Sequence, residues 1–120
     1  MYRLDLKIRL HNGSDIALGP GKADLLDAIA QHGSISAAAR ALGMSYRRAW
    51  LLVETMNRSF RQPLVSALAG GKHGGGTQLT ATGELILQRY RTLCAQALAA
   101  VQVGCDELAE LLAETSPSVS

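Results

Sequence analysis

The feature that most constrains the fold is the segment 33–60, in which two helical stretches flank a glycine. Ser36–Leu42 is short and rich in small residues, Gly43 interrupts it, and Ser45 is placed to cap a second helix. Positions around the turn are small or apolar, as two closely crossing helices require: Ala38, Ala39, Leu42, Met44, Ala49 and Leu52. The segment is therefore interpreted as a helix-turn-helix.

The second helix of this motif is amphipathic when its residues are phased with the helical period. One face is apolar and is expected to lie inward: Ala49, Leu52, Val53, Met56 and Phe60. The opposite face is polar apart from Leu51. Two roles stay open for Leu51, contact with a thymine methyl group and packing on another part of the dimer. Trp50 is expected to pack at the helix edge rather than to stack on a base.

In a helix-turn-helix, the N-terminal residues of the second helix usually reach base edges in the major groove. Arg47 and Arg48 are therefore the candidates for bidentate contacts to guanine. Ser45 and Tyr46 are expected to bind phosphate, and Thr55 and Arg58 to touch the DNA backbone. On an isolated amphipathic helix we would interpret these arginines as a solvated face. Because they lie within a helix-turn-helix, we favour contact with DNA.

Composition and charge agree with a globular DNA-binding domain. Hydrophobic residues make up 48% of the 120-residue chain, which argues against general disorder, and the formal net charge is +2. Five arginines lie between Arg40 and Arg61 against one acid, whereas residues 106–114 hold four acids and no base. No signal peptide or membrane span is recognisable, so we expect a cytoplasmic protein with reduced thiols.

The residues before the motif predict a small hairpin and a helix. Tyr2–Leu10 alternates apolar and polar residues, which predicts a half-buried strand. His11–Ser14 is a turn, and Ile16–Leu18 is a short return strand. Lys22–Gln31 is predicted as a helix that ends at His32 and Gly33.

After the motif, two short strands joined by a glycine-rich loop form a wing. Leu64–Leu68 and Thr77–Thr80 are the strands, and Gly70–Gly76 is the tip. Lys72 and His73 in this tip are candidates for phosphate contact, because glycines let the backbone approach DNA closely. The alternative is a flexible hairpin loop without a role in binding. A P-loop is excluded because Lys72 is followed by His73 rather than Ser or Thr.

A long helix follows, with Thr80 as its cap. Its apolar stripe runs for roughly 45 Å, which is too long to bury on a domain of this size. We therefore predict a homodimer interface along Ile86, Tyr90, Leu93, Ala97, Val101 and Leu108. Gly104 allows a kink or an early helix end. Cys94 and Cys105 are interpreted as small residues of this stripe, with a thiol sensor or an intersubunit bridge left open.

No residue pattern resembles a catalytic or metal site. The predicted fold class is mainly α with a small β component: a winged helix-turn-helix at 1–80, a dimerisation helix at 81–114 and a disordered tail at 115–120. The favoured function is sequence-specific DNA binding as a dimer on a palindromic operator. The alternative is a module that senses a protein partner or a small ligand and binds DNA only non-specifically.

The motif also resembles a known family. The pairing of Ser-Tyr-x-x-Ala-Trp at 45–50 with Gly-Gly-Lys-x-Gly-Gly-Gly at 70–76 is similar to the N-terminal domain of the ModE family of molybdate-responsive transcriptional regulators. The resemblance covers about residues 3–115, and similarity to LysR-type winged domains is looser. It implies a DNA-binding dimer that regulates molybdenum metabolism, with Ser45–Arg48 and Lys72 contacting DNA.

The chain departs from the family because it ends at Ser120, without residues for the separate molybdate-binding domain. Two interpretations remain, a stand-alone DNA-binding variant and a piece of a longer protein, and the Ser/Pro tail favours the first. The chain itself is expected to carry no cofactor. Whether an effector exists stays open: it could be absent, it could be molybdate, another oxyanion or a metal, or it could be bound by a separate partner protein.

Overall fold

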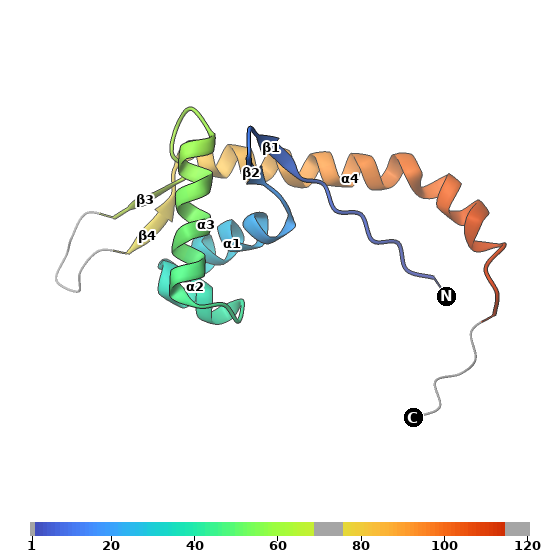
Figure 1. Ribbon diagram of the computed structural model, residues 1–120, viewed down its shortest axis with the longest axis horizontal. Helices are drawn as coiled ribbons and strands as arrows, with labels where there is room; N and C mark the ends of the chain where they lie inside the picture. Colours follow the sequence, from blue (N-terminus) through green and yellow to red (C-terminus); the bar gives the residue numbers. More distant parts are fainter. Residues whose placement is uncertain (1, 69–75, 115–120) are drawn as a thin grey trace, which may run out of the picture.

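The computed structural model describes residues 2–68 and 76–114 and shows a helical domain with two small hairpins and one projecting helix (Figure 1). Three helices form the body: α1 (Pro20–His32), α2 (Ile35–Ala41) and α3 (Tyr46–Ser59). The hairpins are β1 (Leu10–Asn12) with β2 (Asp15–Leu18), and β3 (Val65–Ala67) with β4 (Thr77–Leu79). Helix α4 (Ala81–Ala109) follows the second hairpin. This order confirms the predicted winged helix-turn-helix.

The helix-turn-helix is α2 and α3, and both helices begin with the caps that their sequence provides. The Ser34 hydroxyl accepts a hydrogen bond from the Ala37 amide at 3.0 Å, and the Ser45 hydroxyl accepts one from the Arg48 amide at 3.1 Å. Gly43 lies between them with a φ of 68°, a conformation that favours glycine. The predicted turn is confirmed.

The core lies where α1 packs against α2 and α3. Its largest fully buried side chains are Leu25, Leu26, Ile29, Met56 and Leu64. The α2–α3 crossing is lined by small residues, and Ala38, Ala39 and Ala49 are buried as predicted. Leu42 is more exposed than expected, whereas Met44 and Leu52 are half-buried against the core.

Helix α1 begins two residues earlier than predicted. Pro20 occupies its first turn, where the missing N–H costs nothing. The predicted end is confirmed, because Gly33 is left-handed and its N–H donates to the Ile29 carbonyl at 2.8 Å.

The predicted wing is confirmed as an antiparallel pair in which Val65 faces Leu79 and Ala67 faces Thr77. The Thr77 N–H donates to the Gly33 carbonyl at 2.8 Å, which joins the wing to the junction of α1 and α2. The predicted tip contacts, Lys72 and His73, lie outside the described residues.

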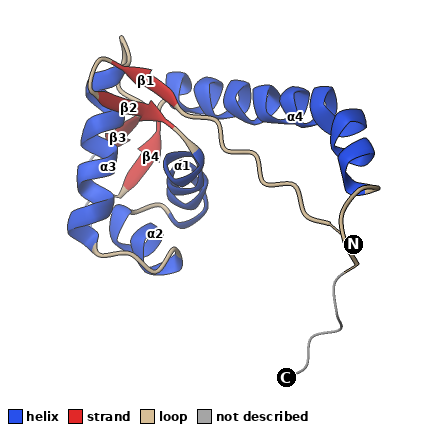
Figure 2. Ribbon diagram, turned by 45° about the vertical axis from the view of Figure 1, so that its right-hand side comes forward, coloured by secondary structure: helices blue, strands red, loops and turns tan. Residues whose placement is uncertain are grey.

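Helix α4 starts at the predicted cap, where the Thr80 hydroxyl accepts a hydrogen bond from the Gly83 amide at 2.9 Å. Gly104 does not end the helix, which continues to Ala109. Figure 2 shows the distal part of α4 leaving the body and bending over its last turns. Only Gly83, Leu87 and Tyr90 of this helix are buried, so its distal part packs little within the chain.

The predicted strand Tyr2–Leu10 is wrong. Residues 2–9, called the N-terminal arm below, form no strand, and β1 covers Leu10–Asn12 only. A strand needs a neighbour for its backbone, and β2 has four residues, so the pairing is short. The arm runs beside α4 instead (Figure 2), where the Tyr90 hydroxyl donates to the Ile8 carbonyl at 2.6 Å.

Candidate nucleic-acid interface

The first residues of α3 form an exposed polar surface. Ser45, Tyr46, Arg47 and Arg48 are all exposed, while Ala49 directly behind them is buried. The predicted inward face is confirmed: Ala49, Val53 and Met56 are buried, and Leu52 and Phe60 are half-buried against the core. Packing on one side thus fixes the direction in which the two arginines emerge.

The middle of α3 is more apolar on its outer side. Leu51 is 46% exposed and Trp50 is 43% exposed, so both present hydrocarbon surface to solvent. The hydroxyl of half-buried Thr55 donates to the Leu51 carbonyl at 3.0 Å. This bond within the helix would have to be exchanged or shared if Thr55 donated to a phosphate.

Arg58, the last basic residue of α3, is paired with an acid that the sequence reading did not connect with it. Its Nε and Nη2 donate to the two carboxylate oxygens of Asp15 at 3.1 and 3.2 Å. This bidentate pair holds the pKa of Asp15 below its ordinary range, chiefly through the hydrogen bond from Arg58. The pair fixes Arg58 against the first hairpin while leaving its side chain 58% exposed.

Asn57 positions the wing relative to α3. Its Oδ1 accepts from the Leu64 and Val65 amides at 2.8 and 3.1 Å, and its Nδ2 donates to the Val65 carbonyl at 3.1 Å. Sequence reasoning missed this role, because the partners become adjacent only after the chain reverses at Pro63. Helix α3 and the wing base are therefore held together by one side chain.

The predicted dimer residues on α4 have different environments. Leu93, Val101 and Leu108 are exposed, Leu108 by 67%, and Ile86 and Ala97 are half-buried. Tyr90 differs, because it is only 4% exposed and packs inside the chain. Burial, aided by the neighbouring Cys94 thiol, raises the pKa of Tyr90 to about 12. Further apolar side chains are exposed on the distal helix: Leu98, Val103, Leu111 and Leu112.

The two cysteines are free thiols, and both are half-buried on α4. Within residues 2–68 and 76–114, no group of three or more His, Cys, Asp or Glu side chains could hold a metal ion. None of the described helices is long and apolar enough to cross a membrane.

These elements define a winged helix-turn-helix domain: a body of three helices, of which α3 is the exposed second helix of the motif, and a two-stranded wing. The sequence profile of the family described as bacterial regulatory helix-turn-helix protein, lysR family, matches residues 22–84. The molybdenum transport protein ModE of Azotobacter vinelandii is 42% identical over 100 residues, which are 83% of this chain and 36% of that protein. The DNA-binding transcriptional dual regulator ModE of Escherichia coli K12 is 42% identical over 74 residues, covering 62% and 28%.

A solved structure supports the fold. The crystal structure of the CbnR_DBD–DNA complex superposes with a TM-score of 0.57 at 20% identity, covering 73% of this chain and 95% of that one. The chain belongs to the bacterial regulatory helix-turn-helix proteins of the lysR family, and its similarity to the ModE proteins fits their N-terminal helix-turn-helix part. It spans about a third of the length of the curated relatives that it matches.

Proposed function

We propose that this chain is the DNA-binding part of a transcriptional regulator linked to molybdenum metabolism and active in the cytoplasm. The observation that carries the proposal is the exposure of Ser45–Arg48 at the start of a helix whose other face is buried in the body. The relatives add to it, because one is named a DNA-binding regulator and another a molybdenum transport protein.

The roles of the α3 side chains follow from their positions along the helix. Arg47 and Arg48 are exposed in the first turn, where a guanidinium fits the two acceptors of guanine. Ser45 and Tyr46 at the helix start bind phosphate. Thr55 and Arg58 lie further along α3 and contact the DNA backbone, with Arg58 held in place by Asp15. The sequence adds Lys72 and His73 as contacts from the wing tip.

We further propose that α4 joins two protomers into a homodimer that reads a palindromic operator. The exposed apolar side chains of α4 support this, since such a stripe is unfavourable in water. The interface includes Ile86, Leu93, Ala97, Val101 and Leu108, whereas Tyr90 stabilises the protomer. In this arrangement residues 1–80 read DNA and residues 81–114 form the dimer.

The test is binding to the promoter regions of its own and neighbouring genes, by footprinting and fluorescence anisotropy, with and without molybdate. Arg47→Ala should lower operator affinity by at least about 1 kcal/mol, because it removes a base contact. Arg3→Ala is the matched control, since Arg3 is an exposed arginine on the arm, away from α3. Equal affinities of the two variants would contradict the assigned contact.

A second function from another class is a partner- or ligand-sensing module with only non-specific DNA binding, which the modest net charge of +2 favours. Equal, strongly salt-dependent affinity for every duplex would support it. A discrete footprint with two half-sites would exclude it. A footprint that changes with molybdate would show that this chain responds to the oxyanion.

A further inference from the structure

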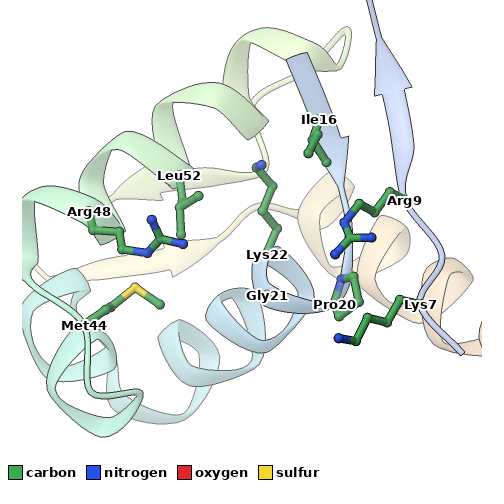
Figure 3. Close-up of a pocket in the computed structure, with 10 residues that line it drawn as sticks. Lys7, Arg9, Ile16, Pro20, Gly21, Lys22, Met44, Arg48 and Leu52 are labelled. Atoms are coloured by element: carbon green, nitrogen blue, oxygen red, sulfur yellow. The ribbon is translucent and has the colours of Figure 1, made fainter. Parts of the chain in front are cut away.

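A basic pocket lies between the N-terminal arm, the start of α1 and the first half of α3 (Figure 3). It has a volume of about 360 Å³, and four cationic side chains line it: Lys7 and Arg9 from the arm, Lys22 from α1 and Arg48 from α3. No acidic side chain is among its lining residues. Four positive charges from three separate segments thus converge on one hollow.

The acids near this pocket leave most of that charge uncompensated. Asp5 lies 3.8 Å from the Lys7 ammonium, and Asp15 is engaged by Arg58. Within the described part of the chain, no carboxylate oxygen lies within 4.0 Å of a charged nitrogen of Arg9, Lys22 or Arg48. The pocket therefore attracts an anion.

Lys22 is the least exposed of the four cations, because it is half-buried whereas Lys7, Arg9 and Arg48 are exposed. Figure 3 shows it between Arg48 on one side and Arg9 on the other. Burial lowers the pKa of Lys22, and the charge of Arg48 lowers it further against the opposing effect of Asp15. A bound anion would replace the hydration that this ammonium has lost.

The backbone brings the arm close to α1 at this point. Gly19 is buried, and a Cβ added to it would lie 3.3 Å from Cγ of Arg9, which is tighter than ordinary contact. The stem of Arg9 packs over this glycine, and Met44 and Leu52 contribute apolar lining. Arg9 and Arg48 thus reach the same pocket from two different elements, the arm and α3. This arrangement suits a ligand that accepts hydrogen bonds from several directions.

We propose that this pocket binds one tetrahedral oxyanion group, with Arg9 and Lys22 as its principal ligands. Arg48 adds a third cation to the pocket in the free protein and contacts guanine when DNA is bound. A tetrahedral group offers several oxygen acceptors in different directions, which matches guanidinium and ammonium donors that reach the pocket from separate elements. The group has two sources: a free oxyanion, or a backbone phosphate of DNA bound along α3. The second source rests on the proposed function, whereas the first does not.

The first experiment titrates the free protein with inorganic phosphate by calorimetry at constant ionic strength. Arg9→Gln/Lys22→Gln removes two charges from the pocket. Arg3→Gln/Arg89→Gln is the matched control, because it removes two charges from exposed side chains outside it. Urea midpoints confirm that both variants fold. Saturable binding that weakens at least tenfold in the pocket variant and not in the control identifies a free oxyanion.

The second experiment measures the salt dependence of duplex binding for the same three proteins. If the ligand is a DNA phosphate, free phosphate does not bind, and the pocket variant loses about 0.9 from the slope of log affinity against log salt. The control keeps the wild-type slope. The proposal is overturned if pocket and control variants behave alike in both experiments. If the wild type binds no duplex, the proposed function fails and the phosphate titration alone decides on the pocket.

Discussion

Gly83→Ala and Gly104→Ala add the same methyl group to the same helix in opposite surroundings. Both glycines lie within α4, and neither has a positive φ. A Cβ at Gly83 would lie 2.1 Å from the Leu64 carbonyl oxygen and 2.9 Å from the carbonyl carbon. A Cβ at Gly104 would meet nothing within 4 Å. Helix α4 therefore contacts the backbone of the wing base at Gly83, whereas the space around Gly104 is open.

The expected free energies follow from two opposing effects. Replacing a glycine inside a helix by alanine stabilises the protein by about 0.5–1 kcal/mol where the space is open. Forcing extra volume into a packed contact costs about 1–3 kcal/mol or more, and here the obstacle is backbone that cannot rotate away. Gly104→Ala should therefore be more stable than the wild type, and Gly83→Ala less stable by about 1–2 kcal/mol.

Urea unfolding followed by circular dichroism measures both variants. Because an effect on association would also change apparent stability, the titrations are run at two protomer concentrations. Equal stabilisation by the two substitutions would refute the close approach of α4 to Leu64.

Three further predictions concern α3 and α4. Met56→Ala should destabilise by about 2–5 kcal/mol because Met56 is fully buried, whereas Leu51→Ala on the exposed face should change urea stability little; similar losses would contradict the assigned orientation of α3. Asn57→Ala should cost about 1–3 kcal/mol in the same assay, since it leaves two amides and a carbonyl at the wing base without partners; a neutral effect would contradict that role. Tyr90→Phe tests an alkaline effect: between pH 10.0 and about 12 the unfolded chain loses this phenolic proton while the folded chain keeps it, so stability falls as pH rises. The variant should show a shallower decline in urea titrations across that range, and an unchanged decline would contradict the assignment.

The parts of the fold that the sequence predicts well are those with local causes. Ser45 caps α3 through a bond to a residue three positions later, and Gly43 adopts a left-handed turn, so both effects are contained in a few residues. The α2–α3 crossing is predicted by small residues at fixed spacing, such as Ala39 and Ala49. Local geometry therefore sufficed for the helix-turn-helix.

The features that the sequence did not predict depend on partners far away in the chain. The arm alternates like a strand, yet Leu6 is 40% exposed, because no strand among the described residues extends alongside the arm. Arg58 finds Asp15 across 43 residues. Arg9 and Lys22 face one pocket only because the arm crosses the start of α1. The amino-acid composition does not indicate which residues that are far apart in the chain come into contact.

The contacts at the wing base also connect the proposed dimer helix to the proposed reading helix. Asn57 of α3 holds Leu64 and Val65, the Leu64 carbonyl accepts from the Thr80 amide at 2.9 Å, and the Thr80 hydroxyl donates to the Pro63 carbonyl at 2.7 Å. The end of α3 and the start of α4 are thus joined through residues 63–65 by a short series of hydrogen bonds. In a dimer formed through α4, the angle between the two copies of this helix would therefore set the separation of the two α3 helices. Half-site spacing in the operator would follow from the packing of α4.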